Sequence, residues 1–147
     1  MFEAIIDGAI AESEIWAAAV LPSHERQLVA VFSPLAPDEV SVGLETVYEA
    51  YLVHYGRPRL FLAPGEDEAV LLGDYLYAHG LVRVAEAGGV RAVRVLADLI
   101  SRCAALRAEG LGGDGDAWVD AARALGGEPD SDAVARALER HSARVAA

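Results

Sequence analysis

Two glutamates spaced four residues apart, Glu45 and Glu49, are the first candidates for chemistry in this sequence. On a helix, this spacing places both carboxylates on one face. Two carboxylates on one face can bind Mg²⁺ together, with waters and substrate phosphates completing the coordination shell. Pairs of this kind are also common on solvated helix surfaces, so the spacing alone leaves a purely structural role open.

A third carboxylate, Asp74, directly follows Gly73 inside the apolar run of residues 69–85. A buried carboxylate needs a partner, and a glycine costs a helix about 1 kcal/mol relative to alanine. One interpretation is that Asp74 faces a metal ion or a polar cavity and that Gly73 allows helices to pack closely. The other is that Asp74 forms a buried ion pair or cap, for example with an arginine.

Two arginines, Arg57 and Arg59, follow the end of a predicted helix in the segment HYGRPRL, residues 54–60. Guanidinium groups match phosphate oxygens, so both are candidate contacts for a phosphate group, although a solvated turn has the same appearance. The sequence contains no P-loop, no dinucleotide-binding fingerprint and no nucleophile–base arrangement. Cys103 lies among apolar residues at helical spacing, where we expect core packing.

Helices must position these residues, because 54% of the chain is hydrophobic and alanine, the best helix former, is abundant. Proline and glycine breaks separate the predicted helices. These cover residues 2–20, 23–32, 37–54, 69–85, 93–108 and 116–125, and a last helix is capped by residues 129–131. The run 69–85 is apolar almost all round, which predicts a helix in the middle of a bundle. The sequence therefore predicts an all-α fold, an antiparallel helical bundle forming a single domain over residues 1–147.

The net charge of −11 narrows the partners that the chain could bind. Nucleic-acid backbones and anionic membranes both require the opposite sign. The N-terminus lacks the basic region of a signal peptide, and no apolar run reaches the roughly 18 residues of a membrane span. We therefore expect a cytoplasmic protein with no transmembrane segment and no nucleic-acid partner.

Residues 54–85 resemble the stretch of trans-polyprenyl diphosphate synthases that runs from an RRGxP turn into a helix carrying A-V-L-x-G-D-x-L. The resemblance extends over roughly residues 38–145, because residues 90–110 and 116–127 look like the next two helical segments of that family. The short, non-catalytic subunits of two-component hexaprenyl and heptaprenyl diphosphate synthases carry a similar GDY helix. The resemblance implies a truncated isoprenoid-synthase-like bundle.

In the full enzymes, two aspartate-rich motifs bind Mg²⁺, which holds the allylic diphosphate for the addition of isopentenyl units. The resemblance places the first motif on residues 45–49, where a threonine replaces an aspartate and glutamates occupy the outer positions. It implies that Glu45, Glu49 and Asp74 are degenerate metal or diphosphate positions, and that Gly73 serves helix packing. The second motif has no counterpart in the 147 residues, so no catalytic residue is assigned.

Other positions of the family pattern are also altered. The two arginines of its turn correspond to His54 and Tyr55. Its Gly-Gln pair falls on residues 106–107 and its Lys-Thr pair on residues 114–115, where the sequence reads Leu-Arg and Asp-Gly. The second replacement reverses the charge at a position expected to face a diphosphate.

The resemblance therefore implies a non-catalytic subunit, regulatory or structural, of a heteromeric polyprenyl diphosphate synthase. Such a chain would not be active alone; Mg²⁺ would be bound by the catalytic partner, whose product length this chain would tune. One alternative is a module that binds a prenyl diphosphate, with Arg57, Arg59 and the two glutamates near the head group. Another is a Mg²⁺-dependent prenyl diphosphate hydrolase, which requires Glu45, Glu49 and Asp74 to converge.

Overall fold

A computed structural model describes residues 1–145 of the chain. The fold is all-α, and over these residues the only β-type pairing is an isolated bridge between Val20 and Phe61. The helices are α1 (Phe2–Glu12), α2 (Glu14–Ala19), α3 (Ser41–Tyr55), α4 (Glu66–Ala108), α5 (Asp114–Ala124) and α6 (Ser131–Val145). Three single 3₁₀ turns lie between α2 and α3, at Ser23–Glu25, Ser33–Leu35 and Asp38–Val40.

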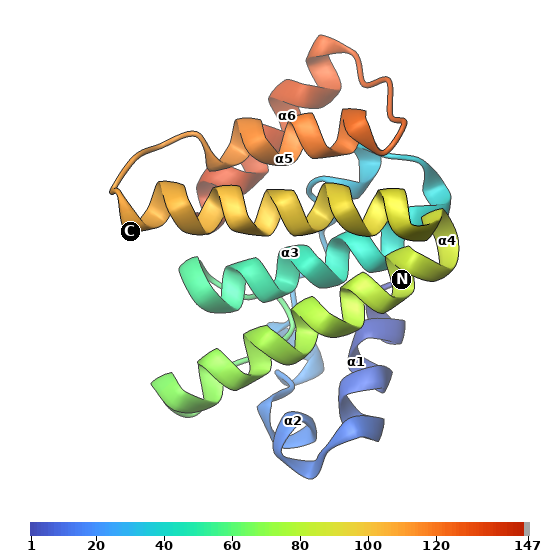
Figure 1. Ribbon diagram of the computed structural model, residues 1–147. Coiled ribbons are helices and arrows are strands. Elements are labelled where there is room, and N and C mark those ends of the chain that lie inside the picture. Colours follow the sequence, from blue (N-terminus) through green and yellow to red (C-terminus); the bar gives the residue numbers. More distant parts are fainter. Residues whose placement is uncertain (146–147) are drawn as a thin grey trace.

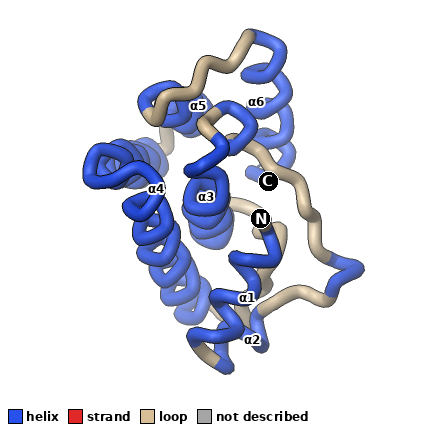
Figure 2. Tube along the Cα trace, turned by 90° about the vertical axis from the view of Figure 1, so that its right-hand side faces the viewer, coloured by secondary structure: helices blue, strands red, loops and turns tan. Residues whose placement is uncertain are grey.

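Helix α3 occupies the centre of the bundle. Every residue from Gly43 to Leu52 is buried. Helix α4 forms one outer face, and α1, α6 and the segment joining α2 to α3 cover the other side of α3 (Figures 1 and 2). Two hydrophobic clusters flank α3: one includes α5, α6 and the second half of α4, and the other includes α1 and the first half of α4. The core is thus built around α3.

Helix α4 is bent at Gly89, whose φ of 68° and ψ of −164° are not helical. A positive φ is readily adopted only by glycine, so the chain can turn here without strain. The sequence predicted that residues 88–89 end one helix, and the bend confirms this boundary. We call residues 66–88 the first leg of α4 and residues 90–108 its second leg; Figure 1 shows the two legs at an angle in front of α3.

Helices α3 and α4 pack closely where Gly43 faces Gly80. A Cβ added to Gly80 would lie 3.0 Å from the carbonyl oxygen of Gly43, and one added to Gly43 would lie 3.1 Å from the carbonyl oxygen of Gly80. Neither position has room for a side chain without moving a backbone. The two glycines therefore set the distance between the central helix and the outer one, a role that the sequence pattern had suggested only for Gly73.

Two predicted helices in the N-terminal third were wrong. Residues 2–20 form two helices, because the chain is extended at Ser13, whose side chain caps α2 by accepting from the amide of Ile15. Residues 23–32 form a single 3₁₀ turn followed by an irregular, non-helical stretch, of which we call residues 26–31 the extended segment. Their amides donate elsewhere: that of Gln27 to the carbonyl of Arg59, and that of Val31 to the carboxylate of Glu45. Tertiary hydrogen bonds therefore replace the helical ones.

The prediction that residues 69–85 form a helix buried in the middle was also wrong. This stretch is helical, but it lies at the surface, where Val70, Leu71 and Val82 are 52%, 59% and 54% exposed. An apolar helix has two ways to avoid water: burial by its own chain or burial by a partner. Here its own chain covers only the side formed by Leu72, Leu76 and Val84.

Among the helices of residues 1–145, none combines the length and the apolar composition needed to cross a bilayer.

Candidate functional site

Glu45 and Glu49 project from α3 into the protein, and the guanidinium of Arg59 lies between their carboxylates. Arg59 Nη1 donates to Glu45 Oε2 at 2.6 Å, and Arg59 Nε donates to Glu49 Oε1 at 3.0 Å. All three side chains are fully shielded from solvent. Burial lowers the pKa of Arg59, but the charges of Glu45 and Glu49 outweigh it and raise that pKa above its ordinary value. We call these three residues the buried ion cluster; with two carboxylates and one guanidinium, it carries one net negative charge.

Backbone amides satisfy the remaining oxygens of the cluster. Oε1 of Glu45 accepts from the amide of Val31 in the extended segment and from the amide of Ser33 at the start of the next 3₁₀ turn, at 3.0 Å each. Oε2 of Glu49 accepts from two amides of the turn after α3, at 2.8 Å each. The four donors are Val31, Ser33, Arg59 and Leu60. The cluster therefore fastens two irregular segments of backbone to the central helix.

The guanidinium of Arg59 is equally well satisfied. It also donates to the carbonyl oxygens of Val29, at 2.8 Å, and Glu45, at 3.3 Å. It lies 5.0 Å from the ring centroid of Tyr48 and 5.1 Å from that of Phe2, within the range of cation–π attraction. Because Arg59 is enclosed and paired, it is not placed to contact a diphosphate in solution.

The carboxylates of the cluster do not fit Mg²⁺. This ion keeps several waters and needs carboxylate oxygens that are open to them. Those of Glu45 and Glu49 are enclosed and accept from N–H donors. Asp74 does not join them, because its side chain is 67% exposed and its partner is His54. Within residues 1–145, no group of three or more His, Cys, Asp or Glu side chains is placed to hold a metal ion.

Asp74 and Gly73 take part in a contact between α4 and the last turn of α3. Asp74 Oδ1 lies 3.5 Å from His54 Nε2 at the surface, so the expectation that Asp74 is buried was wrong. Burial lowers the pKa of His54, and the nearby Asp74 acts in the opposite direction. A Cβ on Gly73 would lie 2.6 Å from His54 Cε1. Gly73 thus makes room for the imidazole, a packing role like the one predicted for it.

A polar cluster around Tyr51 was not predicted. The Tyr51 hydroxyl donates to Asp114 Oδ2, and Arg107 bonds both groups, with Nε donating to Asp114 and Nη2 to the Tyr51 oxygen at 2.8 Å each. Burial, followed by the bond to Asp114, raises the pKa of Tyr51. Arg107 and Asp114 border a cavity of about 470 Å³ between the α4–α5 loop and α6. The sequence offers one signal for this pair: opposite charges seven residues apart, on either side of a glycine-rich loop.

Two further buried groups lie near this cluster. His141 is hydrogen-bonded to the Tyr48 hydroxyl at 2.9 Å, and burial lowers its pKa from 6.5 to about 4. Cys103 is buried in the core, as predicted, and burial raises the pKa of its thiol to about 12. Neither group is poised for nucleophilic or acid–base chemistry near neutral pH.

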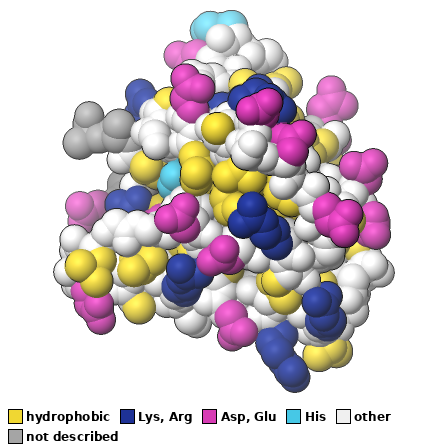
Figure 3. Space-filling model, turned by 90° about the horizontal axis from the view of Figure 1, so that it is seen from above, with side chains coloured by type: hydrophobic (Ala, Val, Ile, Leu, Met, Phe, Trp, Pro, Cys, Tyr) yellow, Lys and Arg dark blue, Asp and Glu magenta, His cyan; other side chains and the backbone are white. Residues whose placement is uncertain are grey.

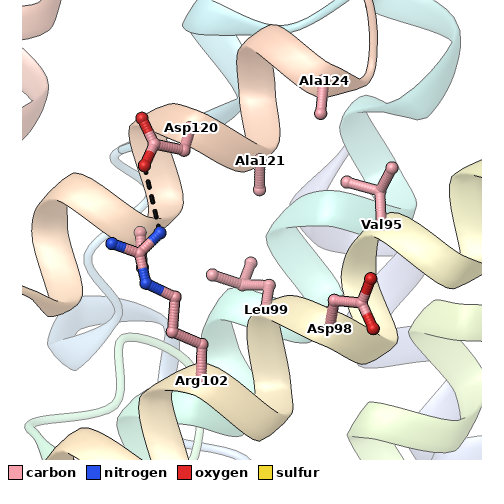
Figure 4. Close-up of a pocket in the computed structure, with 8 residues that line it drawn as sticks. Val95, Asp98, Leu99, Arg102, Asp120, Ala121 and Ala124 are labelled. Carbon is pink, nitrogen blue, oxygen red and sulfur yellow. Dashed lines mark hydrogen bonds and ion pairs between the residues drawn. The ribbon is translucent and has the colours of Figure 1, made fainter.

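A groove of about 210 Å³ runs between the second leg of α4 and α5 (Figure 4). Its floor is aliphatic, formed by Val95, Leu99 and Ala121, and an ion pair between Arg102 and Asp120, 3.0 Å apart, borders it. Seen from the α5–α6 end, the surrounding surface mixes acidic, basic and apolar side chains (Figure 3). The charged residues that line the groove are of both signs, Asp98 and Asp120 against Arg102, so the groove does not favour a ligand of either charge.

The outer face of the first leg of α4 exposes several apolar side chains to solvent. Its exposed apolar residues follow the helical repeat, with Asp74 as the charge among them. We call the following five residues the apolar stripe: Val70, Leu71, Ala78, Val82 and Ala85. The second leg differs, because its exposed residues are mainly charged or alanine, including Arg91, Arg94, Asp98 and Arg102.

Comparison with protein-family models, with curated proteins and with solved structures finds no match to this chain.

Proposed function

We propose that this chain is a non-catalytic subunit that binds a catalytic polyprenyl diphosphate synthase chain and tunes the length of its product. One observation carries the proposal. Glu45 and Glu49, which the resemblance places at the first aspartate-rich motif, form ion pairs with Arg59 inside the fold. On this proposal, the positions that bind metal ions in the full enzymes serve the internal structure of this chain instead of catalysis.

The apolar stripe supports a subunit contact. Val70, Leu71 and Val82 are each more than half exposed on the first leg of α4. Regularly spaced apolar side chains on an exposed helix face are typical of a surface that a partner covers. The stripe lies on the helix whose sequence carries the resemblance, so a synthase chain is the partner it favours.

The alternative of a Mg²⁺-dependent hydrolase is poorly supported by the geometry. Asp74 points outward from α4 beside His54, which lies nine residues from Glu45 along α3. At 1.5 Å per residue, this separation is about 14 Å along the helix axis. The three carboxylates that this activity requires are therefore apart, and two of them are already neutralised in part by Arg59.

Affinity purification of the chain from its native lysate, with mass spectrometry of the co-purifying proteins, tests the proposal. The expected result is a stoichiometric chain carrying two intact aspartate-rich motifs, whose prenyl product changes length when this chain is removed. Leu71→Asp and Val82→Asp should each abolish co-purification. Leu28→Asp is the matched control, because Leu28 is 57% exposed and belongs to the extended segment on the other side of α3.

A chain that purifies without a synthase would overturn the proposal, as would a synthase whose products are the same with and without it. Prenyl transfer by the isolated chain would contradict the non-catalytic assignment.

A further inference from the structure

A cleft of about 260 Å³ opens between α6, the extended segment and the turn after α3. Three arginines border it: Arg57 from the turn, and Arg140 and Arg144 from α6. Figure 2 shows the extended segment running beside α6, and hydrogen bonds join them. This gathering of positive charge is notable in a chain whose net charge is −11.

The three guanidinium groups are held in place by neutral acceptors. Arg57 donates to the carbonyl of Ala143, and Arg140 Nη1 donates to the carbonyl of Ala30 at 3.0 Å. Arg144 Nε donates to the carbonyl of Arg57 at 3.0 Å. A guanidinium has five N–H donors, so these bonds leave most of them available. Among residues 1–145, none of these three arginines forms a salt bridge with a carboxylate.

The charge balance of the cleft favours an anion that carries more than one negative charge. Arg59 forms part of the cleft wall but belongs to the buried ion cluster, whose single net negative charge offsets one of the three arginines. About two positive charges remain. Burial, and then repulsion from Arg57, lowers the pKa of Arg144. An anion between these groups would relieve the repulsion, and arginine forks pair with phosphate oxygens in two-bond geometry.

We propose that this cleft binds the phosphate or diphosphate group of a small molecule through Arg57, Arg140 and Arg144. Gln27, which accepts from Arg144, orients that guanidinium. Val29, 45% exposed at the cleft, offers an apolar surface to an organic group attached to the phosphate. The site needs no metal ion, because arginines supply the charge, and it does not depend on the partner proposed above.

Titration calorimetry with inorganic pyrophosphate, in buffer containing EDTA, tests the site on the wild-type chain. Arg140→Gln should weaken binding about tenfold or more, the usual effect of losing a charge-assisted hydrogen bond. Arg144→Lys, which keeps the charge and loses the fork, should also weaken it. Arg136→Gln is the matched control: Arg136 is exposed on α6 one turn before Arg140 and does not border the cleft. Circular dichroism verifies that each variant is folded.

Saturable binding that Arg140→Gln weakens and Arg136→Gln leaves unchanged would establish the site. Absence of binding at millimolar pyrophosphate, binding that requires Mg²⁺, or equal loss in both variants would overturn it. A second titration, with farnesyl diphosphate, distinguishes the sources of the ligand. Tighter binding than pyrophosphate assigns the site to a lipid-linked diphosphate, and equal binding assigns it to the free anion.

Discussion

Replacing Arg59 by methionine should lower the free energy of unfolding of this protein by more than any single substitution at its surface. The substitution keeps most of the volume of the side chain and removes its charge. Glu45 and Glu49 would then be two fully buried carboxylates with only backbone amides as donors. Because like charges repel and burial disfavours both, the native state loses stability while the unfolded chain does not.

The size of the effect follows from the burial of the cluster. Removing one partner of a buried ion pair costs about 3–5 kcal/mol. The four backbone amides remain, so we expect about 3 kcal/mol, out of the roughly 5–15 kcal/mol that stabilise a typical domain. For a chain of this length, such a loss lowers the melting temperature by roughly 10 °C. Arg59→Lys should fall between methionine and wild type, because it keeps the charge but not the fork.

Urea unfolding followed by circular dichroism measures this difference. Arg94→Met, at an exposed position of α4, is the control and should change stability by less than about 0.5 kcal/mol. Adding Glu45→Gln and Glu49→Gln to Arg59→Met should recover part of the loss, because neutral amides are less costly to bury. If Arg59→Met behaved like Arg94→Met, or if the triple variant were no more stable than the single one, the buried cluster would not be the source of stability.

Two further predictions follow from the helix crossing and from His141. Gly80→Ala should destabilise the fold by about 1–3 kcal/mol in urea unfolding, because its Cβ would meet the backbone of α3. Gly112→Ala, which has nothing within 4 Å, should change stability by less than about 1 kcal/mol, and equal effects would contradict the close crossing. Burial lowers the pKa of His141 from 6.5 to about 4, so as the pH falls the unfolded chain binds a proton at this residue before the folded chain does. The free energy of unfolding should therefore decrease between pH 6.5 and pH 4, by up to about 3 kcal/mol. His141→Gln should flatten this part of the stability–pH curve and His24→Gln, at an exposed position, should not; an unchanged curve for His141→Gln would refute the assignment.

Local backbone physics made much of the fold predictable. The all-α class followed from composition, and a helix over residues 37–54, close to the observed α3, followed from the proline and glycine breaks at its ends; its central place in the bundle was not predicted. Prolines and glycines marked the helix ends, including the bend at Gly89 and the cap of α6, where Asp130 accepts from the amide of Ala133 at 2.8 Å. These features depend on neighbouring residues alone, so they can be inferred without knowing the rest of the structure.

Tertiary structure decided which residues pair. Glu45 and Glu49 share a helix face, as their spacing predicted. The spacing could not show that Arg59 lies between them. Their hydrogen bonds join residues ten to fourteen positions apart. Residues 26–31, part of a predicted helix, are extended instead: the amide of Val31 donates to the carboxylate of Glu45 and that of Gln27 to the carbonyl of Arg59, and neither bond could be foreseen from neighbouring residues.

The sequence by itself therefore determined where helices form and which residues could carry charge into the fold. Only the tertiary structure decided which charges are paired in the interior and which stay at the surface. Arg57 and Arg59 are two residues apart and look equivalent in sequence, yet one is buried between carboxylates and the other borders an open cleft with α6. The physical reason is that burial and pairing depend on segments brought together by folding, and electrostatic free energy changes steeply with both.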